Sequence, residues 1–104
     1  MTEAQKHKSQ VRRSKHWQCF RRKLKSIRRC DEITLMPLRA GWNLHHMDMS
    51  DGNYDDLSDE DKFRCYNRLT HKLIHWLFPY YCKDRTIIDR IKNDLEVMRQ
   101  LNED

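Results

Sequence analysis

Four histidines are the residues of this chain whose type and spacing best suit chemistry. His45 and His46 are adjacent, and His71 and His75 lie four positions apart. In a helix, residues four apart share one face, so His71 and His75 can reach a single metal ion. The adjacent pair can supply a third ligand and leave one imidazole to accept a proton near neutral pH. The pattern predicts metal-assisted hydrolysis.

Each pair alone has a simpler explanation. Adjacent histidines on a half-exposed strand are often incidental polar residues, and two histidines one turn apart arise in helices by chance. The joint pattern favours a shared site over two accidents.

The charge is divided unevenly along the 104 residues, which we expect to form a single domain, residues 1–104. The net charge is +5, but residues 1–30 carry eleven Lys/Arg and one acid, which gives +10. The rest carries ten Lys/Arg and fifteen acids, which gives −5. A basic arm, residues 1–29, on a more acidic body predicts nucleic acid as the partner.

The four cysteines form no CxxC pair, and no stretch resembles a signal peptide or a membrane span. We therefore expect reduced, buried thiols and a cytoplasmic protein without membrane association.

The elements that must position the histidines follow from periodicity and turn residues. Apolar residues at helical spacing, from Trp17 to Ile27, predict a basic amphipathic helix between Glu3 and Arg29. Residues 33–36 and 42–47 read as two strands of a small hairpin. On a regular strand His45 and His46 point to opposite faces, so a bulge or the strand end must bring them together.

Two further helices are expected after an acidic loop, residues 48–61, that contains seven acids. One runs from about Asp59 to Phe78, with Ser58 as its N-cap, and is stopped by Pro79. The last covers residues 84–102, with Asp84 as its cap. Its apolar stripe is either core or the surface of a homodimer. The fold class is therefore α+β: a small hairpin and a crossing helix, flanked by N- and C-terminal helices.

Over roughly residues 30–77 the sequence resembles the HNH endonucleases, the ββα-metal or His-Me finger family that includes colicin-type DNases. The resemblance implies a ββα-metal core at residues 30–78. That family has a strand ending in His-His, a loop, and a helix with further metal-binding histidines. Here these parts are Leu44-His45-His46-Met47, the acidic loop, and Tyr66-Asn67-Arg68-Leu69-Thr70-His71-Lys72-Leu73-Ile74-His75.

The resemblance implies a hydrolase that cleaves DNA phosphodiester bonds. It makes His45, His71 and His75 the ligands of one divalent metal ion, and His46 the general base that takes a proton from the attacking water. Three imidazoles suit zinc or nickel, while nuclease chemistry also proceeds with magnesium or manganese. A phage or mobile-element nuclease fits the size and charge. The cations expected to contact double-stranded DNA are Arg12, Arg13, Arg21, Arg22, Lys25, Arg28, Arg29, Arg68 and Lys72.

Two departures from the family pattern keep alternatives open. The cysteines of a structural zinc knuckle are replaced by Ile33, Asn67 and Thr70, so packing must substitute for that knuckle. The family's central Asn has no match at Lys62 or Phe63, and Asn67 fits its spacing only if His75 is the first helical ligand. The alternative function is a non-catalytic module that keeps the fold and binds nucleic acid or protein. A regulator that acts through its helical surfaces is a third possibility.

Overall fold

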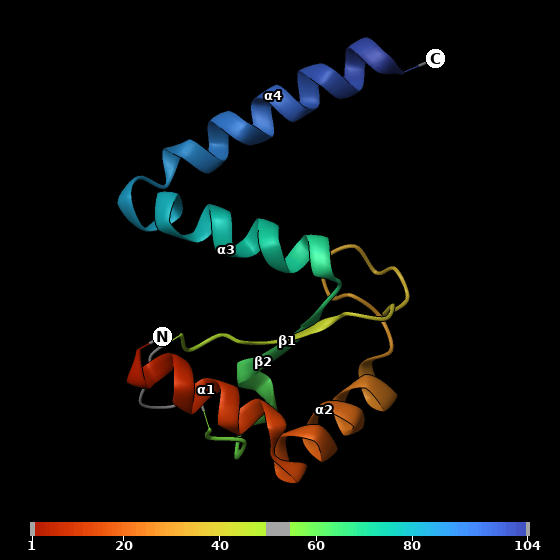
Figure 1. Ribbon diagram of the computed structural model, residues 1–104. Coiled ribbons are helices and arrows are strands. Elements are labelled where there is room, and N and C mark those ends of the chain that lie inside the picture. Colours follow the sequence, from red (N-terminus) through yellow and green to blue (C-terminus); the bar gives the residue numbers. More distant parts are fainter. Residues whose placement is uncertain (1, 50–54, 104) are drawn as a thin grey trace. The chain divides into compact units, whose positions relative to one another are not determined.

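The computed structural model describes residues 2–49 and 55–103. Over these residues the architecture is α+β, as predicted, with four α-helices, a short 3-10 helix and a two-stranded antiparallel hairpin (Figure 1). The chain divides into two compact units, residues 1–71 and 72–104, and the boundary falls inside helix α3.

The basic N-terminal segment forms two helices, α1 (Glu3–Arg13) and α2 (Lys15–Arg28), and not the single helix expected. Ser14 is extended, and its hydroxyl accepts a hydrogen bond from the Trp17 N–H, so it caps α2. A serine that caps in this way interrupts a helix because its side chain replaces the backbone acceptor. The predicted apolar face is buried at Trp17, Phe20 and Leu24, whereas Ile27 remains 59% exposed.

Residues 33–36 form a tight turn, so the strand predicted there is wrong. The Asp31 carboxylate accepts the backbone N–H groups of Ile33 and Thr34, which a strand would need for its ladder. The nearest feature to a strand is a single bridge between Cys30 and Pro37.

The hairpin consists of β1 (Asn43–His46) and β2 (Phe63–Tyr66). β2 lies where the sequence predicted the start of a helix, and the short 3-10 helix Glu60–Lys62, capped by Asp59 and not by Ser58, precedes it. His45 pairs with Arg64, and His46 pairs with Phe63. Residues that face each other across a ladder share one side of the sheet. The hairpin therefore has a His45 side and a His46 side.

The hydrophobic core covers the His46 side of the hairpin. It is formed by buried residues of α2, of β2 and of the segment before β1, namely Trp17, Phe20, Leu24, Trp42, Phe63 and Cys65. The Phe20 and Phe63 rings meet edge to face with centroids 4.8 Å apart. All four cysteines are free, but only Cys65 is buried, while Cys19 and Cys82 are exposed. Burial raises the pKa of the Cys65 thiol to about 11, so this side chain is a neutral core group.

After the hairpin, α3 (Arg68–Lys83) continues through Pro79, which was expected to end it. The final helix, α4 (Thr86–Asn102), begins after Asp84, whose carboxylate accepts the Thr86 N–H. No residue of α4 is buried, so its apolar stripe is not core, and the homodimer stays a prediction. Among the helices described, none is long and apolar enough to cross a membrane.

Candidate metal centre

Three histidines from two elements come together as the sequence predicted. His45 lies on β1, and His71 and His75 lie one turn apart on α3. The potential ligand atoms of His45, His71 and His75 all lie within 4.8 Å of one another. His45 is buried, His71 is half-buried and His75 is exposed. The three side chains are therefore positioned to bind one metal ion.

The distance between the two inner imidazoles fits metal coordination. Nδ1 of His45 lies 3.3 Å from Nε2 of His71. Two nitrogens bound tetrahedrally at about 2.0–2.1 Å from zinc would lie about 3.4 Å apart. The two rings are edge to face, with centroids 5.2 Å apart. His75 completes the set, because its ligand atom also lies within 4.8 Å of those of His45 and His71.

Tyr66 forms a wall of this centre and was not anticipated as a site residue. Its ring centroid lies 5.6 Å from that of His45 and 6.4 Å from that of His71. Burial raises the pKa of the Tyr66 hydroxyl, so it stays protonated at neutral pH. Phe63 and Cys65 alternate with Arg64 and Tyr66 along β2. This alternation could have placed Tyr66 on the His45 side.

His46 is not part of the histidine cluster. It lies on the core side of β1, where its ring stacks on Phe63 with centroids 4.5 Å apart. Both ring nitrogens are buried, and neither has a hydrogen-bond partner among the residues that the structure describes. No bulge turns His46 toward His45, because the ladder register is regular through both residues. The two histidines thus diverge, as a regular strand requires.

Asp31 fastens the turn at residues 31–36 to the beginning of α3. One carboxylate oxygen accepts the N–H groups of Ile33 and Thr34, both at 2.9 Å. The other accepts the Asn67 N–H at 2.7 Å, and the Thr70 side chain also hydrogen bonds to this carboxylate. Asp31 is fully buried, so these bonds hold α3, and with it His71, in place against the turn.

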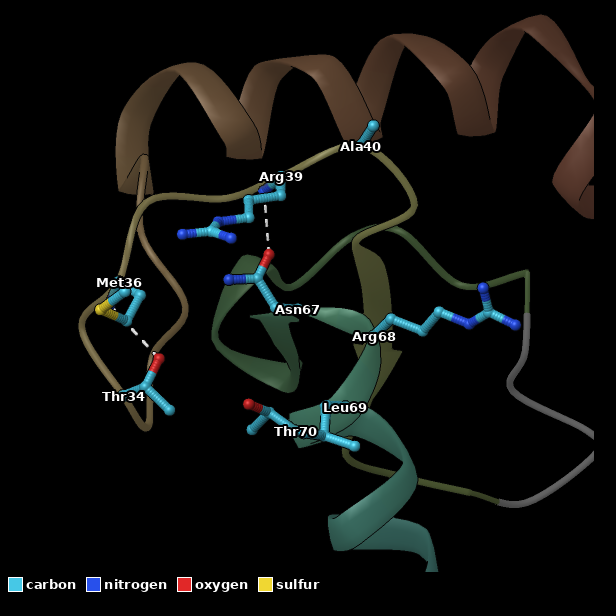
Figure 2. A pocket seen from close by; sticks show the side chains of 8 residues that line it. All are labelled: Thr34, Met36, Arg39, Ala40, Asn67, Arg68, Leu69 and Thr70. Carbon is cyan, nitrogen blue, oxygen red and sulfur yellow. Dashed lines mark hydrogen bonds between the residues drawn. The ribbon is translucent and has the colours of Figure 1, made fainter.

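Asn67 also braces a loop, although not at the family's expected position. Its side-chain oxygen accepts the Arg39 N–H at 2.9 Å, and its side-chain nitrogen donates to the Pro37 carbonyl at 3.0 Å. Figure 2 shows Asn67 reaching Arg39 beside a pocket. Thr34 and Met36 lie on one side of this pocket, and Leu69 and Thr70 of α3 lie on the other.

The predicted DNA-contacting cations fall into two groups. Arg21 and Arg28 are engaged within the fold. The Arg21 guanidinium lies 3.9 Å from the Trp42 ring centroid and donates to the Trp42 carbonyl. Arg28 donates to carbonyls of Phe63 and Glu60 and pairs with Glu32. The other cations have exposed side chains, namely Arg12, Arg13, Arg22, Lys25, Arg29, Arg68 and Lys72.

In comparisons with known proteins, no family model, curated protein or solved structure matches the chain.

Proposed function

We propose that this protein is a metal-dependent endonuclease that hydrolyses DNA phosphodiester bonds, of the HNH type that its motif resembles. The observation that carries the proposal is the convergence of His45 from the strand with His71 and His75 from the helix. A strand and a helix that contribute to one histidine cluster match the arrangement that the resemblance implies.

The residues around the cluster suit a nucleic-acid substrate. A divalent ion bound there supplies a Lewis acid that stabilises charge on a phosphate. His45, His71 and His75 hold that ion, and Tyr66 shields the inner side of the site. Arg68 and Lys72 flank His71 on α3 with exposed side chains, so they can contact backbone phosphates next to the scissile bond.

The proposed general base is His46. Its two buried ring nitrogens, without partners among the described residues, are a feature that fold stability does not explain. To accept a proton from water at the histidine cluster, the His46 ring has to leave its stack on Phe63.

The position of His46 also favours a second candidate function. A non-catalytic module that binds metal and nucleic acid needs the three ligands but no base. The core-side placement of His46, opposite His45 on β1, is the observation that supports this alternative.

Cleavage of supercoiled plasmid by purified protein separates the two functions. The protein is assayed with EDTA and then with added Mg²⁺, Mn²⁺, Ni²⁺ or Zn²⁺. The variants are His46→Ala, His71→Ala and, as a control, His16→Ala, whose ring is exposed on α2 and outside the cluster. We expect metal-dependent nicking that His71→Ala and His46→Ala abolish and His16→Ala leaves intact.

Metal binding by the same variants assigns their roles. His46→Ala should bind the ion as wild type does, whereas His71→Ala should bind it much more weakly. If wild-type protein binds metal and DNA but none of the ions supports cleavage, the non-catalytic module is the correct function.

A further inference from the structure

Leu35 occupies a position that the stability of the fold does not explain. Its φ is +62°, in the left-handed region, and its side chain is 75% exposed. Glycine or asparagine is the usual residue in such a conformation, because a larger side chain clashes with the backbone. A large apolar side chain in water adds a second cost. A residue that is unfavourable in both respects suggests a function.

The turn that presents Leu35 is tightly built. The Leu35 N–H donates to the Asp31 carbonyl, and the Asp31 N–H donates to the Met36 carbonyl, both at 2.8 Å. The Asp31 carboxylate holds the intervening N–H groups. Ile33 and Met36 are also exposed, at 58% and 48%. We call Ile33, Leu35 and Met36 the apolar turn. Its conformation is fixed before any partner arrives.

The apolar turn is coupled to the helix that carries the metal ligands. The bond from the Asn67 N–H to Asp31 and the contact of Asp31 with Thr70 join it to the first turn of α3. His71 is the next residue on that helix. A molecule that contacts the apolar turn is therefore held at a fixed distance from His45 and His71.

The charge around the apolar turn fits a polyanion. The pocket between Met36 and α3 is lined by Arg39 and Arg68, and by no carboxylate. Figure 2 shows these two arginine side chains extending in different directions from the pocket. The acids of the turn face inward, because Asp31 is buried and Glu32 pairs with Arg28 and accepts the Cys65 N–H. Cations beside apolar side chains suit a DNA duplex, which presents phosphates beside stacked bases.

We propose that the apolar turn is a DNA wedge: Leu35, supported by Met36, inserts at a base step of duplex DNA and partly unstacks it, while Arg39 and Arg68 contact the flanking phosphates. Apolar wedges of this kind kink the duplex and position it on the protein. The inference rests on DNA as the proposed substrate. It adds to that proposal how the phosphodiester is placed at the metal centre.

The test uses duplexes that carry 2-aminopurine, whose fluorescence rises when the base unstacks, with EDTA present so that no strand is cut. Affinity is measured by fluorescence anisotropy over a range of salt concentrations. The variants are Leu35→Gly, which suits the left-handed backbone, Leu35→Met, which keeps an apolar side chain, and Arg39→Ala. Ile27→Gln is the control for losing an exposed apolar residue elsewhere, since Ile27 is 59% exposed on α2.

We expect Leu35→Gly to melt no lower than wild type, yet to bind about tenfold more weakly, roughly the effect of burying one leucine. The 2-aminopurine signal should disappear, and Leu35→Met should restore it. The slope of log affinity against log salt should not change in Leu35→Gly, because the lost contact is uncharged, whereas Arg39→Ala should make it shallower by about 0.9. Ile27→Gln should behave as wild type.

Equal affinity and an equal 2-aminopurine signal in wild type and Leu35→Gly would overturn the wedge and leave the proposed nuclease standing. If duplex binding and the 2-aminopurine signal depend on Leu35 but no metal supports cleavage, the wedge is supported and only the proposed enzyme is overturned. Absence of any duplex binding by wild type would overturn both.

Discussion

Asp31 joins two segments that the HNH pattern, in many members, joins through a zinc knuckle. The resemblance would put Ile33, Asn67 and Thr70 where that pattern has the knuckle cysteines. The Asp31 carboxylate accepts the N–H groups of Ile33 and Asn67 and contacts the Thr70 side chain. The buried Asp31 carboxylate, which accepts several hydrogen bonds, thus connects the two segments as a metal ion would in the knuckle. From the sequence we expected packing to substitute for that knuckle, whereas the described structure joins the two segments through the Asp31 carboxylate.

Replacing the Asp31 carboxylate should destabilise the protein substantially. Asp31→Asn keeps the size of the side chain but turns an amide N–H₂ toward donors that need an acceptor. We expect a loss of about 2–4 kcal/mol in the free energy of unfolding, because buried N–H groups are left unpaired. Urea denaturation measures this loss. Asp61→Asn, on the exposed 3-10 helix, is the control and should change stability little. A loss as small as that of Asp61→Asn would contradict this role of Asp31.

The same carboxylate should make stability depend on pH in the acidic range. Burial alone would raise the pKa of Asp31, but hydrogen bonds from Thr34, Asn67, Ile33 and Thr70 outweigh burial and hold it below its ordinary value. The unfolded chain therefore takes up the proton first as the pH falls. The stabilisation by Asp31 is complete above the unfolded pKa of about 3.9, and it is lost as the pH drops through the lower folded pKa.

We therefore expect the difference in unfolding free energy between wild type and Asp31→Asn to be constant above about pH 5 and to shrink below about pH 4. Urea titrations of both proteins over that range measure it. The comparison cancels the other carboxylates, which both proteins share. A difference that grows on acidification would show that the folded state binds the Asp31 proton more tightly.

His46 should be costly to the fold and, if the protein is the proposed endonuclease, necessary for cleavage. Phenylalanine keeps the stack on Phe63 and removes two buried nitrogens that have no partner among the described residues. We expect His46→Phe to raise the free energy of unfolding by about 1–2 kcal/mol and to abolish plasmid cleavage. Thermal and urea unfolding measure the first effect. His16→Phe is the control for adding an aromatic ring to an exposed position. Destabilisation by His46→Phe would mean that the imidazole makes a hydrogen bond the fold needs.

At the scale of elements, the metal centre requires β1 and α3 to be held together. His45 and His71 lie 3.3 Å apart at their nearest ring nitrogens, whereas His75 is exposed. We expect the protein to bind one transition-metal ion by calorimetry. His71→Ala should weaken binding more than His75→Ala, since His71 forms the inner pair with His45. Metal at about 100 times its dissociation constant should stabilise the fold by about 2.7 kcal/mol.

His16→Ala should bind metal as wild type does. Equal losses in His71→Ala and His75→Ala would instead indicate that the two helical ligands contribute alike.

The elements also show what local patterns can and cannot reveal. α2 and α4 were predictable because each carries an apolar stripe at helical spacing. The helix expected over 59–78 was wrong at its start. Phe63, Tyr66 and Leu69 recur at intervals of three, which imitates a helical face, but Phe63 and Tyr66 belong to a strand. A strand depends on its partner, and β1, the partner of β2, is 17 residues away in sequence at the nearest pair, His46 and Phe63.

Only part of the candidate site was predictable from local patterns. The positions of His71 and His75 depend only on helical periodicity, so their proximity follows from the sequence. His45 joins them through the β1–β2 register and the Asp31 bonds to α3, which no periodicity reveals. The sequence motif, through its resemblance to a family, selected the three histidines that the structure brings together. It did not show that His46 packs on Phe63.

At the scale of the whole molecule, positive charge is concentrated in the N-terminal part of the chain. Residues 1–30 sum to +10 and the remainder to −5. Arg12 and Arg13 are exposed in the last turn of α1, and Ser14 breaks the helix immediately after them. Arg21 and Arg28 are engaged inside the fold. Fewer cations of residues 1–30 are therefore exposed than the sequence count suggests. Four of the exposed ones lie on α1 and α2, namely Arg12, Arg13, Arg22 and Lys25.

The position of these cations, and not the net charge alone, should determine DNA affinity. The double variant Arg12→Gln/Arg13→Gln and the matched variant Arg90→Gln/Lys92→Gln on α4 each remove two positive charges. If α1 and α2 contact the phosphates, only the first should weaken binding, and its slope of log affinity against log salt should fall by up to about 1.8. Anisotropy between about 50 and 200 mM salt measures both. Equal effects of the two variants would mean that DNA responds to the overall charge and that the N-terminal helices form no specific interface. A larger effect of the α4 variant would place the phosphate contacts on α4 and not on α1.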